Sequence, residues 1–251
     1  MDSEKRVALL IDADNISASY CKLIIDEVSD EGVIGQKRIY GDWGASNLGS
    51  WKNAIIDNAL NPIQQIRYTT GKNATDSAMI IDAMDILYGG NVDSFCIVSS
   101  DSDFTKLAIR LRESGMFVMG MGEAKTPKSF VAACNKFKYL DVLQKNIKRE
   151  EHHDNHAQQE PEPAEKESSV PPFRSIRKAI VGYLESTSDD MEWVLLGTIG
   201  HSLTKLYPGF DSRNYGFKKL SDMLKNIPQL EVRGMLTSQS PIEQLHVRVK
   251  P

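Results

Sequence analysis

The chain has 251 residues, of which 41% are apolar and 25% are charged, and its formal net charge is −4. This composition is typical of a soluble globular protein, and no apolar run approaches the length that crosses a bilayer. The three cysteines, Cys21, Cys96 and Cys134, lie far apart in apolar stretches, which argues against a disulfide framework or a zinc site. The charged N-terminus passes directly into an apolar run, unlike a signal peptide. We therefore expect a cytoplasmic protein without a membrane segment.

The charge is unevenly distributed along the chain. Residues 1–144 carry −4, residues 145–172 carry −3 and residues 173–251 carry +3. The overall acidity argues at first sight against a nucleic-acid partner, but a mildly basic C-terminal part is compatible with phosphate contacts. Part of the acidic excess in residues 1–144 is explained if some carboxylates are metal ligands.

Residues 1–144 alternate strand-like runs with helical patterns. Thr75 is predicted as the N-cap of the third helix. Strands separated by helices of this size predict right-handed βαβ units, a mainly parallel sheet and an α/β fold. The predicted strands are residues 6–12, 36–40, 63–67, 94–98 and 116–120, and the predicted helices are a stretch ending near Ser29, then residues 51–59, 76–88 and 104–113.

The character of the sequence changes after residue 144. Residues 145–172 have no apolar period and contain four prolines, seven acids and three histidines, which predicts a disordered acidic linker. From residue 173 a compact domain is expected. Its apolar spacing predicts three helices, and the runs 230–232 and 245–249 are predicted to pair as a hairpin, which together give a small winged-helix-like domain.

Four aspartates are placed where a parallel sheet brings chain ends together. Asp12 ends the first predicted strand, Asp101 and Asp103 follow the fourth, and Asp76 opens the helix after the third. Ligands of open α/β sheets bind outside the carboxyl ends of the strands, where the strand order reverses. If the first and fourth strands are neighbours there, Asp12 faces Asp101 and Asp103, and Asp76 closes the ring. Asn15 is placed to orient the Asp12 carboxylate or a water.

Carboxylates that lie this close raise one another's pKa unless a cation is bound between them. Oxygen-only ligands select Mg²⁺ or Mn²⁺ over Zn²⁺, and such an ion can activate water and stabilise the charge on a phosphodiester during hydrolysis. One ion and two ions are both compatible with the pattern. Aspartates at such positions also cap helices, so each of them taken alone is more typical of a structural role.

Four motifs occur in order: Leu10-Ile-Asp-Ala-Asp-Asn-Ile16, Tyr40-Gly-Asp-Trp43, Ala74-Thr-Asp76 and Ser99-Ser-Asp-Ser-Asp-Phe104. Through them, residues 5–143 resemble the NYN family of PIN-like nucleases. The resemblance implies a PIN-like three-layer αβα sandwich and metal-dependent cleavage of RNA. It also implies an acidic set of Asp12, Asp76, Asp101 and Asp103, with Asn15 as the companion polar residue. Asp14 and Asp82 lie near this set; one interpretation is that they support the metal ligands, and the favoured one is a solvent-facing loop acid and a helix residue with local hydrogen bonds.

Several further residues are predicted to face RNA at the same edge of the sheet, although ordinary solvated side chains explain each basic one equally well. These residues are Ser100, Arg67, Lys72, Lys106 and Lys128.

The C-terminal part carries four further motifs: Glu192-Trp-Val194, Leu196-Gly-Thr-Ile-Gly200, Pro208-Gly-Phe-Asp211 and Tyr215-Gly-Phe-Lys-Lys-Leu220. Residues 173–250 thereby resemble a LOTUS (OST-HTH) domain, which implies association with RNA, including guanine-rich folded RNA, and with a protein partner. Contact with an RNA backbone is expected from Arg213, Lys218 and Lys219. Trp193, Phe210 and Tyr215 are predicted as core residues in preference to stacking platforms for RNA bases, because their neighbours are apolar.

The sequence thus favours a metal-dependent endoribonuclease, residues 1–144, tethered to an RNA-binding domain, residues 173–251. The alternative is a catalytically weak RNA-binding adaptor that recruits a protein partner. A phosphatase of the haloacid-dehalogenase type is suggested by Asp12 and Asp14, but Ile16 occupies the position that usually requires a small hydroxyl residue.

Overall fold

The apolar run at residues 6–12 forms a central strand, β1 (Arg6–Asp12), of a six-stranded parallel sheet in the order β3-β2-β1-β4-β5-β6. The computed structural model describes residues 4–43, 49–65, 74–152, 168–187, 193–237 and 240–250. The remaining strands are β2 (Val33–Gly41), β3 (Asn61–Gln64), β4 (Ser94–Val98), β5 (Phe117–Gly122) and β6 (Lys136–Tyr139).

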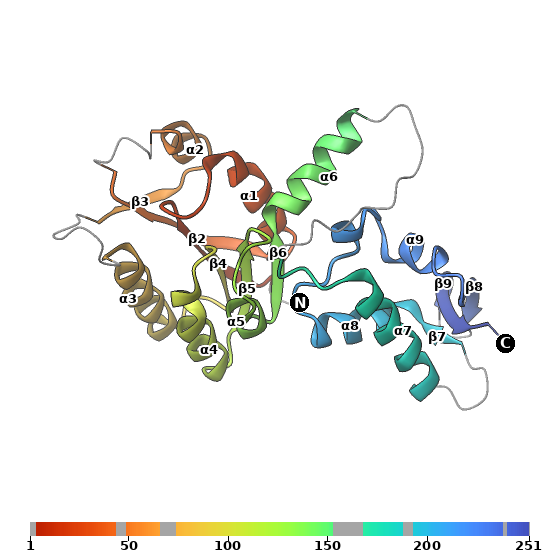
Figure 1. Cartoon of the computed structure of the whole chain (residues 1–251). Coiled ribbons are helices and arrows are strands. Elements are labelled where there is room, and N and C mark those ends of the chain that lie inside the picture. The colour runs from red at the N-terminus through yellow and green to blue at the C-terminus, as the bar shows by residue number, and fades with distance from the viewer. Residues whose placement is uncertain are drawn as a thin grey trace. The chain divides into compact units, whose positions relative to one another are not determined.

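Helices cover both faces of this sheet, so the unit has three layers (Figure 1). Alternate β1 residues, Leu9 and Ile11 among them, pack with Ile24 of α1 in one core cluster. Ala8 and Leu10 point the other way and are also fully buried, as expected for a strand covered on both sides. The helices are α1 (Cys21–Ser29), α2 (Trp51–Asp57), α3 (Ala74–Gly89), α4 (Thr105–Glu113), α5 (Lys128–Ala133) and α6 (Leu140–His152).

The predicted α/β sandwich is confirmed, with differences at single elements. The predicted strand at 63–67 is β3, which lies slightly earlier in the chain, and residues 66–67 are outside the described residues. The helix α5 and the strand β6 were not predicted from the sequence. The predicted start of the linker at residue 145 is wrong for residues 145–152. There α6 continues to His152, and its buried residues Leu140 and Leu143 lie before residue 145, so the continuation shows no apolar period in the sequence.

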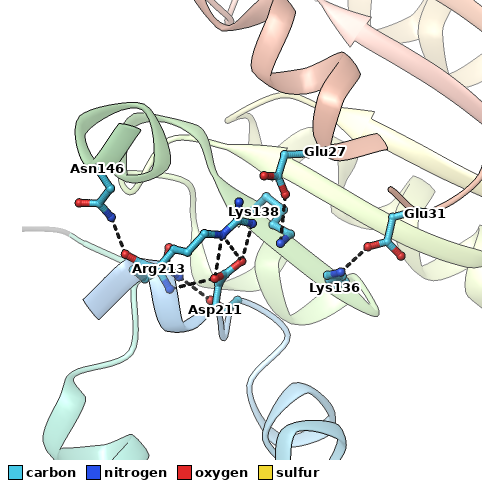
Figure 2. Close-up of polar contacts among 9 residues, drawn as sticks. Glu27, Glu31, Lys136, Lys138, Asn146, Asp211 and Arg213 are labelled. Carbon is cyan, nitrogen blue, oxygen red and sulfur yellow. Dashed lines mark hydrogen bonds and ion pairs between the residues drawn. The ribbon is translucent and has the colours of Figure 1, made fainter. Parts of the chain in front are cut away.

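The edge strand β6 is attached to α1 by two ion pairs (Figure 2). Lys136 pairs with Glu31 just beyond α1. The Nζ of Lys138 lies 3.1 Å from the Oε2 of Glu27, and these two side chains are only 8% and 7% exposed. Removal of one member of a buried ion pair is strongly destabilising, so we expect the Lys138–Glu27 pair to be important for the attachment of β6.

The C-terminal unit contains three α-helices and an antiparallel sheet in the order β7-β9-β8. Its core is formed by the helical apolar stripes predicted from the sequence, including Ile176, Ile180, Leu203 and Leu224, with Val247 of the sheet. The elements are α7 (Phe173–Thr187), β7 (Val194–Leu195), α8 (Leu196–Leu206), a 3₁₀ turn (Ser212–Tyr215), α9 (Leu220–Lys225), β8 (Leu230–Thr237) and β9 (Ser240–Val249).

The predicted hairpin is present as the β8–β9 pair, in which Val232 lies opposite Val247. The chain divides into two compact units, Met1–Gln144 with Glu167–Ser169, and Lys145–Lys166 with Val170–Pro251. Among the described helices, none combines the length and the apolar character that a membrane crossing requires.

Candidate metal centre

The strand order of the N-terminal sheet reverses between β1 and β4. These two strands pair in parallel, with Ile11 opposite Val98. The residues that follow, Asp12 and Ser99, therefore leave the sheet side by side at its carboxyl edge. This edge is where ligands bind in open α/β sheets, and the predicted neighbourhood of the first and fourth strands is present.

Asp12 is fully buried and its carboxylate is held by protein donors. Its Oδ2 accepts hydrogen bonds from the Asn15 side-chain amide at 2.7 Å and from the Ser99 hydroxyl at 2.8 Å. Its Oδ1 accepts from the backbone N–H groups of Asp14 and Asn15. Burial raises the pKa of Asp12, and the hydrogen bonds from Asn15 and Ser99 act in the opposite direction. The ionised form of Asp12 thus depends on a small set of fixed donors.

Three other carboxylates converge beside it. One oxygen each of Asp76, Asp101 and Asp103 lies within 4.8 Å of the others. Asp76 starts from α3, while Asp101 and Asp103 come from the turn after β4, where Asp101 accepts a hydrogen bond from the Asp103 N–H at 3.0 Å. Burial, followed by the charges of Asp12, Asp101 and Asp103, raises the pKa of Asp76 to about 6. This cluster is therefore a concentration of negative charge at the carboxyl edge of the sheet.

A hydrogen bond fastens the start of α3 to the loop after β1. The Thr75 hydroxyl donates to the Asp14 Oδ2 at 2.8 Å. Thr75 was predicted as an N-cap, but α3 already begins at Ala74, so its hydroxyl is used for this tertiary contact. Asp14 is therefore not a solvent-facing loop acid. The effect of the contact is to place Asp76, the next residue of α3, beside the carboxyl edge.

Asp82 also has long-range partners instead of the local ones expected. Its Oδ2 accepts a hydrogen bond from the buried Tyr40 hydroxyl at 2.7 Å and lies 2.6 Å from the Arg38 guanidinium. Both partners belong to β2, so Asp82 anchors the middle of α3 on the sheet. No sequence pattern indicated this contact, because the two segments are about forty residues apart.

Gly122 at the end of β5 is required by the close approach of the turn after β4. A Cβ at this position would lie 2.6 Å from the Ser99 carbonyl oxygen, 2.6 Å from the Thr126 Oγ1 and 3.1 Å from the Ser100 Oγ. The next residue, Glu123, donates its N–H to the Ser100 Oγ at 2.9 Å. The segments that follow β4 and β5 are thus in contact at the carboxyl edge of the sheet.

Of the predicted RNA-facing residues of this unit, one is used in a contact within the protein, two are exposed, and two lie outside the described residues. Ser100 is half-buried and is used in the contact with Glu123. Lys106 and Lys128 are exposed in the first turns of α4 and α5, both of which follow the carboxyl ends of strands. Arg67 and Lys72 lie outside the described residues. Of the predicted RNA-facing cations of this unit, Lys106 and Lys128 are therefore the two within the described residues, and the topology places both near this edge.

In the C-terminal unit, the predicted RNA-binding cations differ in their contacts and exposure. The Arg213 guanidinium is bound to the Asp211 carboxylate through contacts of 2.8 to 3.2 Å (Figure 2). Lys218 and Lys219 are exposed. Phe210 and Tyr215 belong to the core, as predicted. Trp193 is half-buried, and the Arg248 guanidinium lies 4.5 Å from the centre of its ring.

The donor chemistry of the cluster fits a hard divalent cation. Carboxylate oxygens are the ligands that Mg²⁺ and Mn²⁺ prefer, and no thiol or imidazole joins the group among the described residues. A cation would also remove the mutual repulsion that raises the Asp76 pKa. Asp12 does not belong to the 4.8 Å group, but its charge contributes to the raised Asp76 pKa, so it lies within electrostatic reach.

The fold and this edge define a PIN-like, nuclease-type α/β domain. Residues 6–141 match the NYN domain family, and residues 171–241 match the OST-HTH/LOTUS domain. The chain belongs to the NYN domain family, within the PIN-like nuclease superfamily, and it carries a C-terminal LOTUS domain.

Similar proteins were found by sequence and by structure. An uncharacterized protein of Methanocaldococcus jannaschii, MJ0482, is 27% identical over 123 residues, which cover 47% of this chain and 48% of that protein. The chain thus spans about half the length of this curated relative. A Vibrio parahaemolyticus protein of unknown function, VPA0982, aligns with a TM-score of 0.47 and 17% identity over 55% of this chain and 93% of that one. A Nitrosomonas europaea protein, NE0665, aligns with a TM-score of 0.28 and 35% identity over 39% of this chain and 92% of that one.

Proposed function

We propose that this chain is an endoribonuclease that hydrolyses RNA phosphodiesters with Mg²⁺ or Mn²⁺ held by Asp76, Asp101 and Asp103. The observation that carries the proposal is the approach of these three carboxylates to within 4.8 Å at the carboxyl edge of the sheet. Charges of one sign at such spacing are stable in the ionised form when a cation is bound. Membership of the NYN family supports RNA as the substrate class.

The residues around the cluster have separable roles in this proposal. A bound divalent ion would supply an activated water and stabilise the negative charge that develops on the phosphoryl group. Asp76, Asp101 and Asp103 would hold the ion through carboxylate oxygens. Asp12 adds a fixed negative charge to the same centre, and Asn15 and Ser99 keep its carboxylate oriented by donating to Oδ2.

Substrate binding is assigned to cations at the same edge. Lys106 and Lys128 lie in the first turns of the helices that follow β4 and β5, so their ammonium groups can meet phosphates on either side of the scissile bond. The LOTUS domain, which is mildly basic, would add affinity for longer RNA through the tether between the two units.

The decisive experiment compares Asp101→Asn with Asp85→Asn, a matched change on the exposed side of α3. Purified full-length proteins are incubated with labelled single-stranded RNA in Mg²⁺ and in chelator. We expect Mg²⁺-dependent cleavage by the native protein and by Asp85→Asn, and a loss of about 10²-fold or more in Asp101→Asn, because changes that only reorient ligands already cost 10–100-fold.

A second readout in the same experiment separates metal binding from cleavage. Titration with Mn²⁺ should raise the melting temperature of the native protein and of Asp85→Asn, and have little effect on Asp101→Asn. Cleavage that is equal in all three proteins would assign the activity to another site or a contaminant. Binding of RNA without any cleavage by the native protein would favour the adaptor function and a protein partner for the C-terminal domain.

A further inference from the structure

The sheet of the C-terminal unit has one face on the core and one face turned away from it. Val194, Val247 and Val232 lie opposite one another across β7, β9 and β8, and all three contact the core. Because side chains alternate along a strand, the neighbouring row, Leu195, His246 and Arg233, points to the opposite face.

The next row on this outer face is formed by Arg248 and Glu231, which also lie opposite each other. The Arg248 guanidinium donates from Nε and Nη2 to the Glu231 Oε2 at 2.9 and 2.7 Å. It also lies 4.5 Å from the centre of the Trp193 ring. These contacts fix a planar cation on an aromatic ring, with the Arg248 side chain still 26% exposed. We call Trp193, Leu195, Arg233, His246 and Arg248 the outer-sheet patch.

The chemistry of the outer-sheet patch fits an anionic partner with flat apolar groups. Arg233 is exposed and Leu195 is 38% exposed, so the patch offers a cation and an apolar surface beside the Arg248–Trp193 pair. Glu231 is the one acid in these two rows, and it is bound to Arg248. Unpaired RNA bases stack on aromatic rings and on arginine guanidinium planes, while phosphates bind cations.

We propose that the outer-sheet patch binds single-stranded RNA, with a base stacked on the outer plane of the Arg248 guanidinium and a backbone phosphate at Arg233. Trp193 acts as a positioning residue that supports the guanidinium from below. This inference deepens the proposed function, because it assigns an RNA site to the sheet and not to the helical cation Arg213. Arg213 is bound to Asp211, which reduces its capacity for a phosphate.

The test measures RNA affinity of the full-length protein in chelator, where metal-dependent cleavage is silent. A labelled single-stranded 20-mer is titrated, and binding is followed by fluorescence anisotropy at several salt concentrations. Stacking of one base typically contributes about 1–3 kcal/mol, so Trp193→Leu and Arg248→Gln should each weaken binding by roughly fivefold or more. Arg248→Lys should bind nearly as weakly as Arg248→Gln, because it keeps the charge and loses the plane.

The phosphate contact has its own signature. Arg233→Gln should lower the slope of log affinity against log salt by about 0.7, the value for one phosphate of a single strand, whereas Arg233→Lys should keep the slope. Lys178→Gln on α7 removes the same charge from another exposed position and should change affinity less than twofold. Melting temperatures of all variants identify any that fail to fold. Arg233→Gln should fold normally, because the Arg233 side chain is solvent-exposed.

Two results would overturn the proposal. The first is native-like RNA affinity in Trp193→Leu, Arg248→Gln and Arg233→Gln. The second is displacement of the RNA by a polyglutamate peptide as efficiently as by unlabelled RNA, which would make the patch a docking surface for an acidic protein segment. Absence of cleavage in Mg²⁺ would contradict the nuclease proposal but not the proposed RNA site on the outer-sheet patch, because RNA affinities measured in chelator do not depend on cleavage.

Discussion

At the scale of single residues, burial raises the pKa of two aspartates at the carboxyl edge, Asp12 and Asp76, but their hydrogen-bond partners differ. Asp12 is buried, but hydrogen bonds from Asn15 and Ser99 favour its ionised form. Burial, followed by the charges of four nearby aspartates, raises the pKa of Asp76 to about 6. Ionisation of Asp76 therefore costs free energy in the metal-free protein. A cation bound at the cluster would reduce this cost.

The stability of the metal-free protein should reflect this carboxyl. The Asp76 pKa is about 6 when folded and 3.8 when unfolded, so its contribution to stability is full below about pH 4 and is lost as the pH rises through 6. Asp76→Asn has no carboxyl at this position and does not show this loss. Between pH 4 and 7.5, the free energy of unfolding of the variant should therefore rise relative to that of the native protein by up to about 3 kcal/mol, since one pKa unit is worth about 1.4 kcal/mol.

Urea unfolding in chelator at the two pH values measures this difference. The same titrations with Mn²⁺ should reverse the order at pH 7.5, because only the native protein gains stability from the metal. An unchanged difference between native protein and Asp76→Asn across this pH range would show that Asp76 titrates normally.

At the scale of elements, short contacts between segments distant in sequence set the shape of the cluster. α3 is fastened at its start by the Thr75–Asp14 hydrogen bond and in its middle by the contact of Asp82 with Tyr40. The turn after β4 is held from behind by the end of β5, where Gly122 leaves room for the Ser99 carbonyl. The carboxylates are thus placed by three elements that meet at one edge.

The role of the β5 end predicts a large effect of Gly122→Ala. The added Cβ would lie 2.6 Å from the Ser99 carbonyl oxygen, so the turn that carries Ser99 and Asp101 must shift. We expect a loss of about 1–3 kcal/mol in stability, as for other overpacked sites, and a larger relative loss of metal affinity and cleavage. Thermal unfolding and Mn²⁺ titration measure the two effects.

Gly35→Ala in β2 is the matched control. The nearest atom to its added Cβ would be the Val7 carbonyl oxygen at 4.0 Å, so this change should leave metal affinity unaltered. Equal losses of metal affinity in both variants would attribute the effect to general destabilisation of the sheet.

At the scale of the whole molecule, the chain joins a nuclease-type unit to a small unit with its own core. The core of the second unit is formed by residues from Ile176 to Val247 and is separate from the cluster around β1. Two tethered binding units increase the affinity for a ligand long enough to reach both, and have no such effect on a short ligand.

A shortened protein that ends at His152 tests this division. We expect it to cleave a six-nucleotide RNA at a rate within about twofold of the full chain, and to bind a 40-nucleotide RNA at least about tenfold more weakly, as expected when a tethered site is removed. Circular dichroism melting verifies that the shortened protein is folded. Equal affinity for the long RNA would remove the LOTUS domain from RNA binding.

The sequence by itself determined the α/β architecture, most strand positions, the helices and hairpin of the C-terminal unit, and the candidate acids. These features follow from local periodicity, and the strand runs at residues 6–12 and 94–98 agree with β1 and β4 to the residue. Local patterns also explain the error at the linker, since the buried residues of α6, Leu140 and Leu143, lie before residue 145 and the rest of the helix has no apolar period.

Only the tertiary structure decided how the acids are divided between two environments. Asp76, Asp101 and Asp103 form the close group, while Asp12 is held beside it by Asn15 and Ser99. The contacts of Thr75 with Asp14 and of Trp193 with Arg248 were likewise decided there. The physical reason is that periodicity reports which face of an element is buried, whereas distances between side chains depend on how separate elements pack together.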